Sequence, residues 1–460
     1  MGIAGKTIKG YFKSRVRAKH IYSAMRFVPR VILEQIKQRR LRELVAYCAA
    51  KSVFYKEKFK FHGINPDNVR SMDDLKGIFT TGMDLIERRK DFICGQDLIA
   101  FETTGTQGRN KWLHFSRHEI NKMANSCMVG LLMLDFRRTD RFLNCFNYSF
   151  WVPGFVFQRG VEKLGAFCLG ASKTSPESIY ERLDAYKINA LLGYPSLLMR
   201  VTDLAEKHGA PKITGIMTAG ERITPEVRSW MEQVWGCNVY ATYGLTEACG
   251  GVGGECVRKN GYHIDELLNI VEIDEPDEYG YGEIILTTLT RRCMPLIRYR
   301  TGDVGRIIRE RCGCGLPTMR LENVPGRIDE KIKIGTAYFL PNVFDRAIHS
   351  VDGVKRDYQL VAYWKGNKEV LELNLESEIP SDKLSEEVLK AIFREDKDMA
   401  NNVSYGMFTL KIRFNPPGSL RGDDIKLKRF VDKRLAQEGR RDYRIEGVSP
   451  EGGHNVRYEM

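Results

Sequence analysis

The chain has 460 residues, of which 43% are hydrophobic, and it carries a formal net charge of +13 at pH 7. This length allows two or more domains, and no apolar run is long enough to cross a bilayer. The basic N-terminus lacks the apolar stretch of a secretory signal. We therefore expect a cytoplasmic protein whose eleven cysteines are free thiols or metal ligands rather than disulfides.

The first 45 residues hold twelve lysines and arginines but only two acidic residues, Glu34 and Glu43. A basic segment of this kind could contact an anionic membrane surface or an acidic carrier protein. Because charge runs usually solvate a surface, we favour a solvated helical face. No nucleic-acid-binding motif accompanies the charge, so no nucleic-acid partner is expected.

Apolar residues at helical spacing predict a helix over residues 27–55 and short helices over 72–75 and 85–88. The following stretch, 101–112, combines hydroxyls, glycines and cations. Its members are Thr103, Thr104, Gly105, Thr106, Gly108, Arg109 and Lys111. Glycines let main-chain N–H groups meet an anion, while hydroxyls and cations bind phosphate oxygens. The stretch predicts a phosphate-binding loop that lacks Walker spacing, with an ordinary turn as the alternative.

Strands and helices then alternate along the chain. The predicted helices cover 118–132, 175–186, 196–207 and 224–235, with another beginning at 161–165, and the predicted strands cover 142–146, 166–170, 190–193, 213–219 and 238–241. This alternation predicts an α/β fold with a parallel sheet covered on both faces. Ligands bind outside the carboxyl ends of such strands, where residues 193–196, 218–221 and 242–247 lie, although each segment could instead be a helix cap.

Four motifs, in order along the chain, resemble those of the adenylate-forming enzymes. Residues 103–111 resemble their phosphate-binding loop, 243–247 their Tyr-Gly-x-Thr-Glu segment, 299–303 their Tyr-x-Thr-Gly-Asp segment, and 326–335 their hinge. Within this superfamily, Gly220-Glu221 and the run Cys312-Gly-Cys-Gly look most like the phenylacetate–CoA ligase branch. The resemblance covers nearly the whole chain.

The resemblance implies a two-step reaction. A carboxylic acid attacks the α-phosphate of ATP to give an acyl adenylate and pyrophosphate, and a thiol such as CoA then displaces AMP. Lys111 and the Thr/Gly loop would hold the β- and γ-phosphates, Glu247 would bind Mg2+ and Thr246 the α-phosphate. Nucleotide-binding roles are implied for Asp303 at the ribose, Arg327 at the ribose or phosphate, and Gly220, Glu221, Tyr243 and neighbouring Gly244 at the adenine.

The resemblance also implies two domains. A large adenylation domain would cover residues 1–327, and a smaller, mobile α+β domain would cover 328–460 and swing about Asp329. In the smaller domain we expect strands at 357–364, 369–375 and 408–414 and a helix at 383–393.

The C-terminal tail departs from the family pattern. A catalytic lysine that contacts the α-phosphate and the carboxylate during adenylation aligns here with His454, which lacks a permanent charge at pH 7. Adenylation could then be weak, could use Lys426 or Lys428 instead, or could have been lost.

Cysteine and histidine residues are placed in two pairs, Cys256 with His263 and Cys312 with Cys314, which flank strands expected at 283–289 and 294–298. Four such ligands suit a tetrahedral structural Zn2+ that ties two loops together, as members of the phenylacetate–CoA ligase branch can carry. Free thiols and an ordinary histidine are the alternative. Cys249 is a reserve ligand.

The substrate is the least specified part. The aromatic segment 148–157, with Tyr148 and Trp151, and the pair Tyr194-Pro195 would line a pocket for an aryl or other flat apolar acid, although aromatic residues also build cores. CoA, a phosphopantetheine arm of a carrier protein, or an amine would each suit the fold as acceptor. An acyltransferase or amide-forming relative and a non-catalytic nucleotide-binding homologue remain as alternatives. The oligomeric state stays open, a dimer included.

Overall fold

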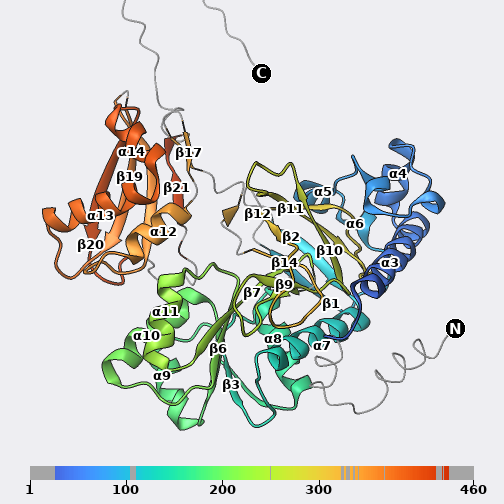
Figure 1. Ribbon diagram of the computed structural model, residues 1–460, viewed down its shortest axis with the longest axis horizontal. Coiled ribbons are helices and arrows are strands. Elements are labelled where there is room, and N and C mark those ends of the chain that lie inside the picture. The colour runs from blue at the N-terminus through green and yellow to red at the C-terminus, as the bar shows by residue number, and fades with distance from the viewer. Residues whose placement is uncertain are drawn as a thin grey trace, which may run out of the picture. The chain divides into compact units, whose positions relative to one another are not determined.

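The computed structural model describes residues 26–103, 110–248, 250–322, 326–327, 332–334, 337–339, 341–366, 368–420, 427 and 429–434. Contacts divide the chain into two compact units. The larger takes the chain as far as Lys331 together with Leu340–Ser350, and the smaller takes Ile332–Phe339 and Val351–Gly422 with most of the residues that follow (Figure 1). No helix among the described residues has the length and apolar character needed to span a bilayer.

The larger unit is built on a nine-stranded sheet with the order β13-β14-β9-β8-β7-β6-β5-β3-β4. Strands β4, β3, β5, β6 and β7 run parallel, and the other neighbours are antiparallel. The bounds are β3 Arg141–Asn144, β4 Phe167–Gly170, β5 Ala190–Gly193, β6 Gly215–Ala219, β7 Asn238–Leu245, β8 Gly250–Gly254, β9 Tyr262–Ile264, β13 Ile307–Ile308 and β14 Arg320–Leu321. The predicted α/β fold is confirmed.

Helices cover both faces of the parallel strands (Figure 1). Alternate strand residues enter two different cores, because successive side chains of a strand point to opposite faces. Leu191 and Ile216 pack with α9 (Pro176–Ala185), α10 (Pro195–His208) and α11 (Pro225–Trp235), whereas Leu192 and Met217 pack with α7 (Arg117–Met133) and α8 (Val152–Leu164).

The boundaries of several elements differ from the sequence prediction. Helix α8 begins at Val152 and ends at Leu164, with Gly165 as its C-cap, so residues 161–165 close this helix rather than open one. Residues 294–298 do not form a strand; the strand is β12 (Tyr299–Gly305), and Arg298 before it has φ +46°. Strand β7 extends past Ala241 to Leu245 and turns back into β8 rather than into a helix, so Thr246 lies in a turn and caps no helix.

A second sheet completes the larger unit. Its antiparallel order is β10-β11-β12-β15, with β10 Asn269–Asp274, β11 Gly282–Thr288 and β15 Gly326–Arg327. A separate antiparallel pair joins β1 (Ile99–Thr103) to β2 (Lys111–Phe115). The predicted N-terminal helix is two helices, α3 (Arg30–Lys51) and α4 (Val53–Phe61), because Ser52 is extended and its hydroxyl caps α4 by accepting a hydrogen bond from Tyr55 N. Short helices α5 (Gly82–Glu87) and α6 (Arg89–Phe92) follow.

The smaller unit has the expected α+β character. Strands β18 (Tyr358–Lys365) and β19 (Lys368–Glu376) pair antiparallel, while β20 (Thr409–Asn415) runs parallel to β19 and β21 (Phe430–Asp432) parallel to β18. The remaining elements are β16 Ile332–Ile334, β17 Ala337–Phe339, α13 Asp382–Glu395 and α14 Lys397–Ser404. Helix α12 (Asn342–His349) groups with the larger unit, where the His349 ring contacts Thr224 at 3.0 Å. Asp329, the predicted hinge position, lies outside the described residues.

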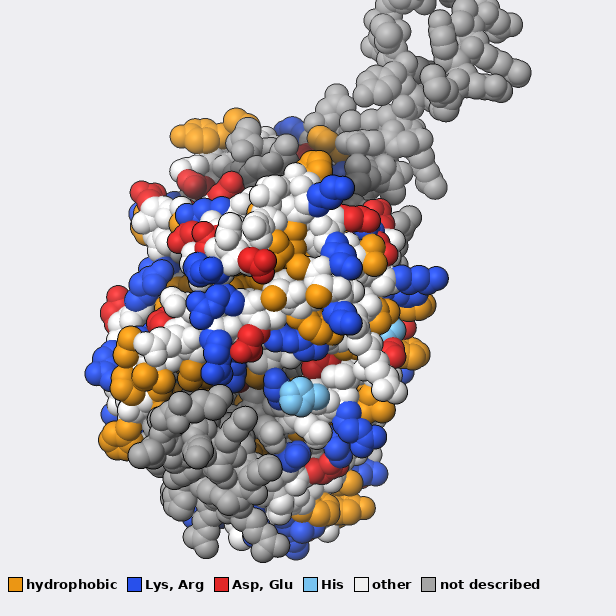
Figure 2. All heavy atoms as spheres, turned by 90° about the vertical axis from the view of Figure 1, so that its right-hand side faces the viewer, with side chains coloured by type: hydrophobic (Ala, Val, Ile, Leu, Met, Phe, Trp, Pro, Cys, Tyr) orange, Lys and Arg blue, Asp and Glu red, His pale blue; other side chains and the backbone are white. Residues whose placement is uncertain are grey.

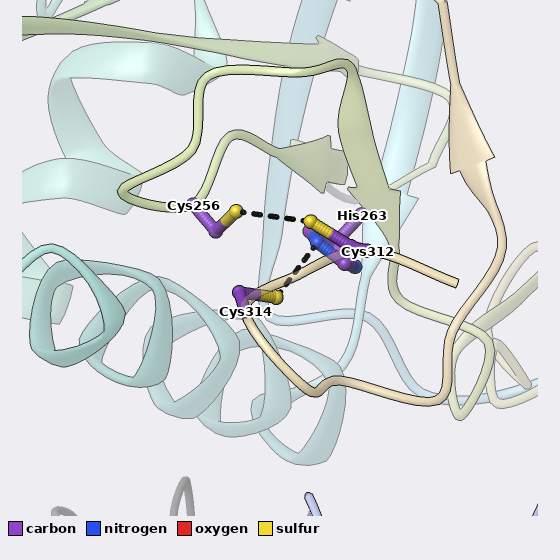
Figure 3. Close-up of side chains that lie close together, drawn as sticks. All are labelled: Cys256, His263, Cys312 and Cys314. Atoms are coloured by element: carbon purple, nitrogen blue, oxygen red, sulfur yellow. Dashed lines mark hydrogen bonds between the residues drawn. The ribbon is translucent and has the colours of Figure 1, made fainter. Parts of the chain in front are cut away.

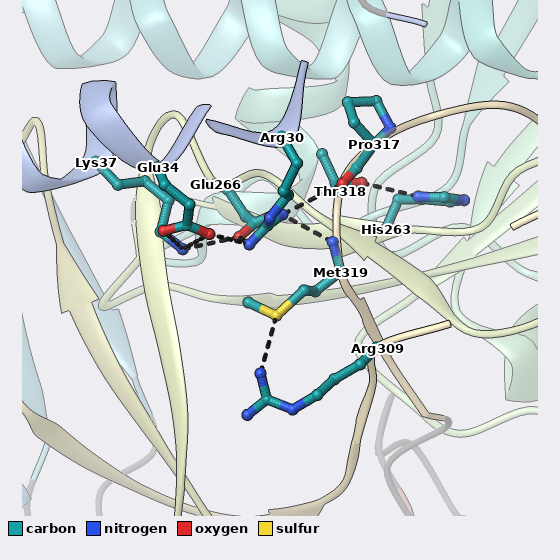
Figure 4. A network of polar contacts seen from close by, with 9 residues as sticks. All are labelled: Arg30, Glu34, Lys37, His263, Glu266, Arg309, Pro317, Thr318 and Met319. Carbon is teal, nitrogen blue, oxygen red and sulfur yellow. Dashed lines mark hydrogen bonds and ion pairs between the residues drawn. The ribbon is translucent and has the colours of Figure 1, made fainter. Parts of the chain in front are cut away.

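The buried carboxylate of Glu266, whose side chain is 1% exposed, anchors the first turns of helix α3 to the body of the larger unit (Figure 4). Both guanidinium nitrogens of Arg30 contact it, Lys37 Nζ donates at 2.9 Å, and the Met319 amide donates at 3.0 Å. Arg30 also bonds the carbonyl of Pro317 at 3.2 Å. Burial alone would raise the pKa of Glu266, but Arg30 and Lys37 outweigh it and lower that pKa.

Replacing Glu266 by glutamine is expected to lower the free energy of unfolding by about 2–3 kcal/mol, below the 3–5 typical of a fully buried pair because Arg30 is partly exposed. Glu34→Gln, at a half-exposed position that contacts the same two cations, should stay within about 0.5 kcal/mol. Because the Glu266 pKa is lowered, its contribution should be present at neutral pH and lost as the pH falls through that pKa. Urea unfolding at two pH values tests this; equal effects of the two variants would contradict it.

The basic residues of α3 are therefore partly engaged in internal ion pairs. On the face shown in Figure 2, lysine and arginine side chains are interspersed with acidic and apolar ones and do not form an unbroken patch. The solvated helical face favoured from the sequence for the first 45 residues stays a prediction. The first 25 residues lie outside the described part of the chain.

Candidate active site

A buried cluster joins three of the motif segments. Lys111 Nζ lies 2.5 Å from Glu247 Oε1, and the Tyr299 hydroxyl lies 3.0 Å from Lys111 Nζ and 2.8 Å from the same Oε1. Glu247 is 4% exposed and Tyr299 1% exposed. The cluster brings the start of β2, the turn after β7 and the start of β12 to one point.

The electrostatics keep Glu247 ionised. Burial by itself would raise the pKa of its carboxyl group, but the charge and hydrogen bond of Lys111, with the hydrogen bond of Tyr299, more than offset burial and lower it. The carboxylate is therefore negative at neutral pH inside a buried site. Such a group is a strong ligand for a hard cation.

The backbone around Glu247 is clamped by Arg291, which is 2% exposed. One of its guanidinium nitrogens donates to the Glu247 carbonyl, and the other donates to the His114 carbonyl at 3.1 Å. Its guanidinium also lies 4.5 Å from the ring centre of Phe115. Since His114 and Phe115 belong to the strand that begins with Lys111, Arg291 fixes the two partners of the ion pair relative to each other.

A second pair lies on neighbouring elements. Tyr243 on β7 donates its hydroxyl to Asp303 Oδ2 at 2.6 Å, and Asp303, on β12, is 5% exposed. Asp303 lies directly opposite Arg327 in the pairing of β12 with β15, although only the backbone of Arg327 is described. The sequence assigned all three residues to the nucleotide. Asp303 and Arg327 lie on the paired strands β12 and β15 of the second sheet, and Tyr243 reaches Asp303 from β7 of the nine-stranded sheet.

The phosphate-binding loop itself is described only at its two ends. Thr103 lies opposite Lys111 at the end of the β1–β2 pair where the loop connects the two strands, and its buried hydroxyl has no hydrogen-bond partner among the described residues. A buried hydroxyl without a partner suits a ligand oxygen. Thr104, Gly105, Thr106 and Gly108 of the loop, and His454 of the tail, lie outside the described residues, as do Lys426, Lys428 and Cys249.

The segment after β6 meets the start of α10. Glu221 accepts a hydrogen bond from the Ser196 amide at 3.0 Å, so its carboxylate caps the N-terminus of α10. Gly220 has φ +78°, and a Cβ there would lie 3.0 Å from Tyr194 Cε1. Gly244 is close to β8 in the same way, because a Cβ would lie 2.5 Å from the Gly250 carbonyl oxygen. Both glycines are therefore required by close packing.

Gly220→Ala is expected to cost about 2–4 kcal/mol, of which about 1–2 come from the left-handed backbone and the rest from the Tyr194 contact. Gly236→Ala is the matched control, since Gly236 has φ +60° and no atom lies within 4 Å of the place that a Cβ would take. It should show only the backbone cost. Chemical denaturation of both variants measures the difference, and equal losses would refute a steric role for Tyr194.

The predicted acid-binding residues follow two neighbouring strands, β3 and β5. Tyr194 is 3% exposed and meets Phe146 edge to face at 4.9 Å, and Pro195 begins α10. The Tyr148 hydroxyl contacts Asn144 at 2.7 Å and Gln158 at 2.9 Å, and Trp151 is the residue before α8. Their rings are partly packed into the core, and their substrate role stays a prediction.

The four predicted metal ligands do converge (Figure 3). Their ligand atoms all lie within 4.8 Å of one another, and all four side chains are buried: Cys256, His263, Cys312 and Cys314. The Sγ atoms of Cys256 and Cys312 are 3.7 Å apart, and Cys314 Sγ is 3.3 Å from His263 Nε2. The other ring nitrogen of His263 contacts the Thr318 hydroxyl at 2.8 Å, which orients Nε2 toward the thiols.

The profile of the AMP-binding enzyme family matches residues 31–275, more than half of the chain. The chain belongs to the AMP-binding enzyme family. It is 28% identical over 441 residues to a phenylacetate–coenzyme A ligase of Thermus thermophilus, covering 88% of this chain and 98% of that protein, and 24% identical over 423 residues to the Pseudomonas putida ligase, covering 88% and 95%. A crystal structure of 2-hydroxyisobutyryl-CoA ligase with 2-HIB-AMP superposes with a TM-score of 0.74 at 20% identity, covering 88% of this chain and 90% of that chain.

Two residues of this AMP-binding enzyme were missed as site residues from the sequence. Tyr299 belonged to a recognised motif, but no pattern indicated that its hydroxyl reaches Lys111 and Glu247. Arg291 belongs to no motif, and since Arg292 stands next to it, no sequence pattern singles it out.

Proposed function

We propose that this AMP-binding enzyme is an AMP-forming acid–CoA ligase that activates an aryl carboxylic acid. The observation that carries the proposal is the buried Lys111–Glu247–Tyr299 cluster, which unites three nucleotide-binding motifs of the family in one site. Phenylacetate–coenzyme A ligases from several bacteria match most of the chain, which supports CoA as acceptor and an aryl acid as substrate.

In the proposed reaction Lys111 holds phosphate oxygens of ATP together with the Thr103 hydroxyl. Asp303 accepts hydrogen bonds from the ribose, and Tyr243 keeps its carboxylate in place through the 2.6 Å bond. These contacts orient the α-phosphate toward the incoming carboxylate, which lowers the entropic part of the barrier. Thr246, in the turn beside Glu247, is proposed to contact the α-phosphate.

Mg2+ is proposed to bind at Glu247. The fit is supported by a buried carboxylate that stays ionised and would need a cation once Lys111 moves to phosphate. When bound, the ion would neutralise charge on the transferred phosphoryl group. His454 is proposed to take the position of the family's adenylating lysine, with one hydrogen bond in place of a fixed charge.

A structural Zn2+ is proposed at Cys256, His263, Cys312 and Cys314. The Sγ–Sγ separation of 3.7 Å between Cys256 and Cys312 agrees with the about 3.8 Å that two Zn–S bonds of about 2.3 Å at a tetrahedral angle require. Four soft or borderline ligands in a buried site match a closed structural centre. It would tie the segment after β8 and strand β9 to the loop between β13 and β14.

The test is acid-dependent pyrophosphate release with Mg-ATP across aryl and aliphatic carboxylic acids, with and without CoA. Release with aryl acids that becomes thioester formation when CoA is added supports the proposal. Release without any thioester would favour a carrier protein or an amine as acceptor. Bound AMP without release of pyrophosphate from any acid would contradict the proposal and favour a non-catalytic homologue.

A further inference from the structure

The Tyr299 hydroxyl occupies a special position in the cluster. It makes hydrogen bonds to both members of the ion pair, at 3.0 Å to Lys111 Nζ and 2.8 Å to Glu247 Oε1. A phenol has one proton to donate and lone pairs to accept with. Since Lys111 can only donate and an ionised Glu247 can only accept, the direction of both hydrogen bonds is fixed.

The ring that carries this hydroxyl is held rigidly. Tyr299 is 1% exposed. Its backbone is fixed by hydrogen bonds between Thr80 and the residues on either side of it. The Thr80 amide donates to the Arg298 carbonyl at 3.0 Å, and the Arg300 amide donates to the Thr80 carbonyl at 2.8 Å. Thr80 is itself fixed through its hydroxyl, which contacts the Tyr55 hydroxyl and the Ile297 carbonyl, each at 2.8 Å. The Tyr299 hydroxyl therefore has a fixed position in the site.

Lys111 and Tyr299 do not have equal mobility. Lys111 has a flexible side chain at the start of β2, next to the phosphate-binding loop, and in the proposed function it moves from Glu247 to phosphate. Both contacts fall on the same oxygen of Glu247, Oε1. When Lys111 leaves, the hydrogen bond from Tyr299 can still keep the carboxylate oriented.

We propose that Tyr299 is a positioning residue that holds Glu247 in the orientation that binds the cation accompanying ATP, and that it guides the exchange of Lys111 from Glu247 to phosphate. This inference rests on the proposed function and deepens it. Hydrogen-bonding partners of metal-ligating carboxylates commonly change metal affinity about 10- to 100-fold. Tyr299 touches neither the acid nor the nucleotide in this scheme and acts through Glu247.

Tyr299→Phe removes only the hydroxyl. The experiment measures ATP affinity by calorimetry at a series of Mg2+ concentrations, with no acid and no CoA present, so that it does not depend on turnover. We expect the Mg2+ concentration for half-maximal enhancement of ATP binding to rise about tenfold or more. Affinity for AMP without Mg2+, which reports on Asp303 and its surroundings, should change less than about twofold.

Tyr358→Phe is the matched control, because Tyr358 is a fully buried tyrosine in the smaller unit. It should leave the Mg2+ dependence of ATP binding unchanged. An unchanged Mg2+ dependence in Tyr299→Phe overturns the proposal, whatever happens to activity. An equal loss of AMP binding overturns it too, since the hydroxyl would then only stabilise the fold. If wild-type protein binds Mg-ATP but activates no acid, the proposed function is refuted. That result does not decide the role of Tyr299, because the measurements of ATP affinity at different Mg2+ concentrations test it separately.

Discussion

Glu247→Gln is expected to lower acid-dependent pyrophosphate release about 10²- to 10³-fold, the range seen when one preorganised electrostatic contact to a transition state is lost. Glutamine keeps the shape of the side chain and can still accept from Tyr299, but it carries no charge for a cation. Lys111 also loses its ion-pair partner at 2.5 Å. The measurement is a coupled pyrophosphate assay at saturating acid and varied Mg2+.

Glu266→Gln is the matched control for this variant. It also removes a buried carboxylate that pairs with an arginine and a lysine, but at α3 rather than at the motif segments. Its stability should fall while its turnover number at a permissive temperature stays within about twofold. A Glu247→Gln enzyme with more than about a tenth of the wild-type rate would show that Glu247 is not the cation ligand.

The lowered pKa of Glu247 adds a pH dependence. Because Lys111 and Tyr299 keep the carboxylate ionised, its charge and its contribution to stability persist as the pH falls and are lost only below the usual range for a glutamate. Protonation of Glu247 in the free enzyme, where Lys111 is still paired with it, should therefore not limit kcat/KM on the acid side down to about pH 5.

Cys312→Ser is expected to remove bound zinc and to lower the free energy of unfolding by more than about 4 kcal/mol, because the loss of a structural metal belongs to the largest class of single-residue effects. The wild-type protein should carry about one zinc per chain, measured by elemental analysis with a chelator-treated sample in parallel. Thr318, which orients His263, lies between the residues that bind Arg30 and Glu266. Zinc loss should therefore also expose α3 to limited proteolysis.

Cys237→Ser controls for the removal of a thiol outside the cluster, since Cys237 is a partly buried free cysteine. It should keep full zinc content and lose less than about 1.5 kcal/mol. Wild-type protein without zinc that retains its stability would contradict the metal site and leave four free buried side chains.

The parallel strands could be predicted because each is a short apolar run between helical segments, and the structure confirms them within a few residues. Helix α8 could not. Its first residues were interpreted as an aromatic segment that lines a pocket, and its glycines are points of close contact: a Cβ at Gly160 would lie 2.3 Å from Cys127 Sγ, and one at Gly154 would lie 2.5 Å from the Asn147 carbonyl oxygen. Close helix packing, not a turn, requires them.

Strand β12 begins later than the strand predicted at 294–298, again because of tertiary contacts. The apolar run before it satisfies strand propensity, but Arg298 has φ +46° and its guanidinium lies against the Phe79 ring at 4.3 Å, so pairing starts one residue later. Strand β7 continued past its predicted end because β8 supplies hydrogen bonds to Tyr243 and Leu245. Tertiary pairing decided both boundaries, and local sequence does not encode it.

The candidate site could likewise be predicted only in part. Motifs gave Lys111, Glu247 and Asp303 by residue type, and the Cys/His spacing gave all four members of the metal cluster. What the motifs could not give is which side chain contacts which. Lys111 and Glu247 are 136 positions apart in the sequence, and the contacts of Tyr299 and Arg291 depend on how two sheets and a turn meet.

The most direct measurement is mass spectrometry of the products formed from one aryl acid, Mg-ATP and CoA. An acid–CoA ligase should yield aryl-CoA, AMP and pyrophosphate in equal amounts, with none of the three when the acid is omitted. Formation of ADP, or AMP and pyrophosphate without a CoA thioester at saturating CoA, would contradict the proposed reaction.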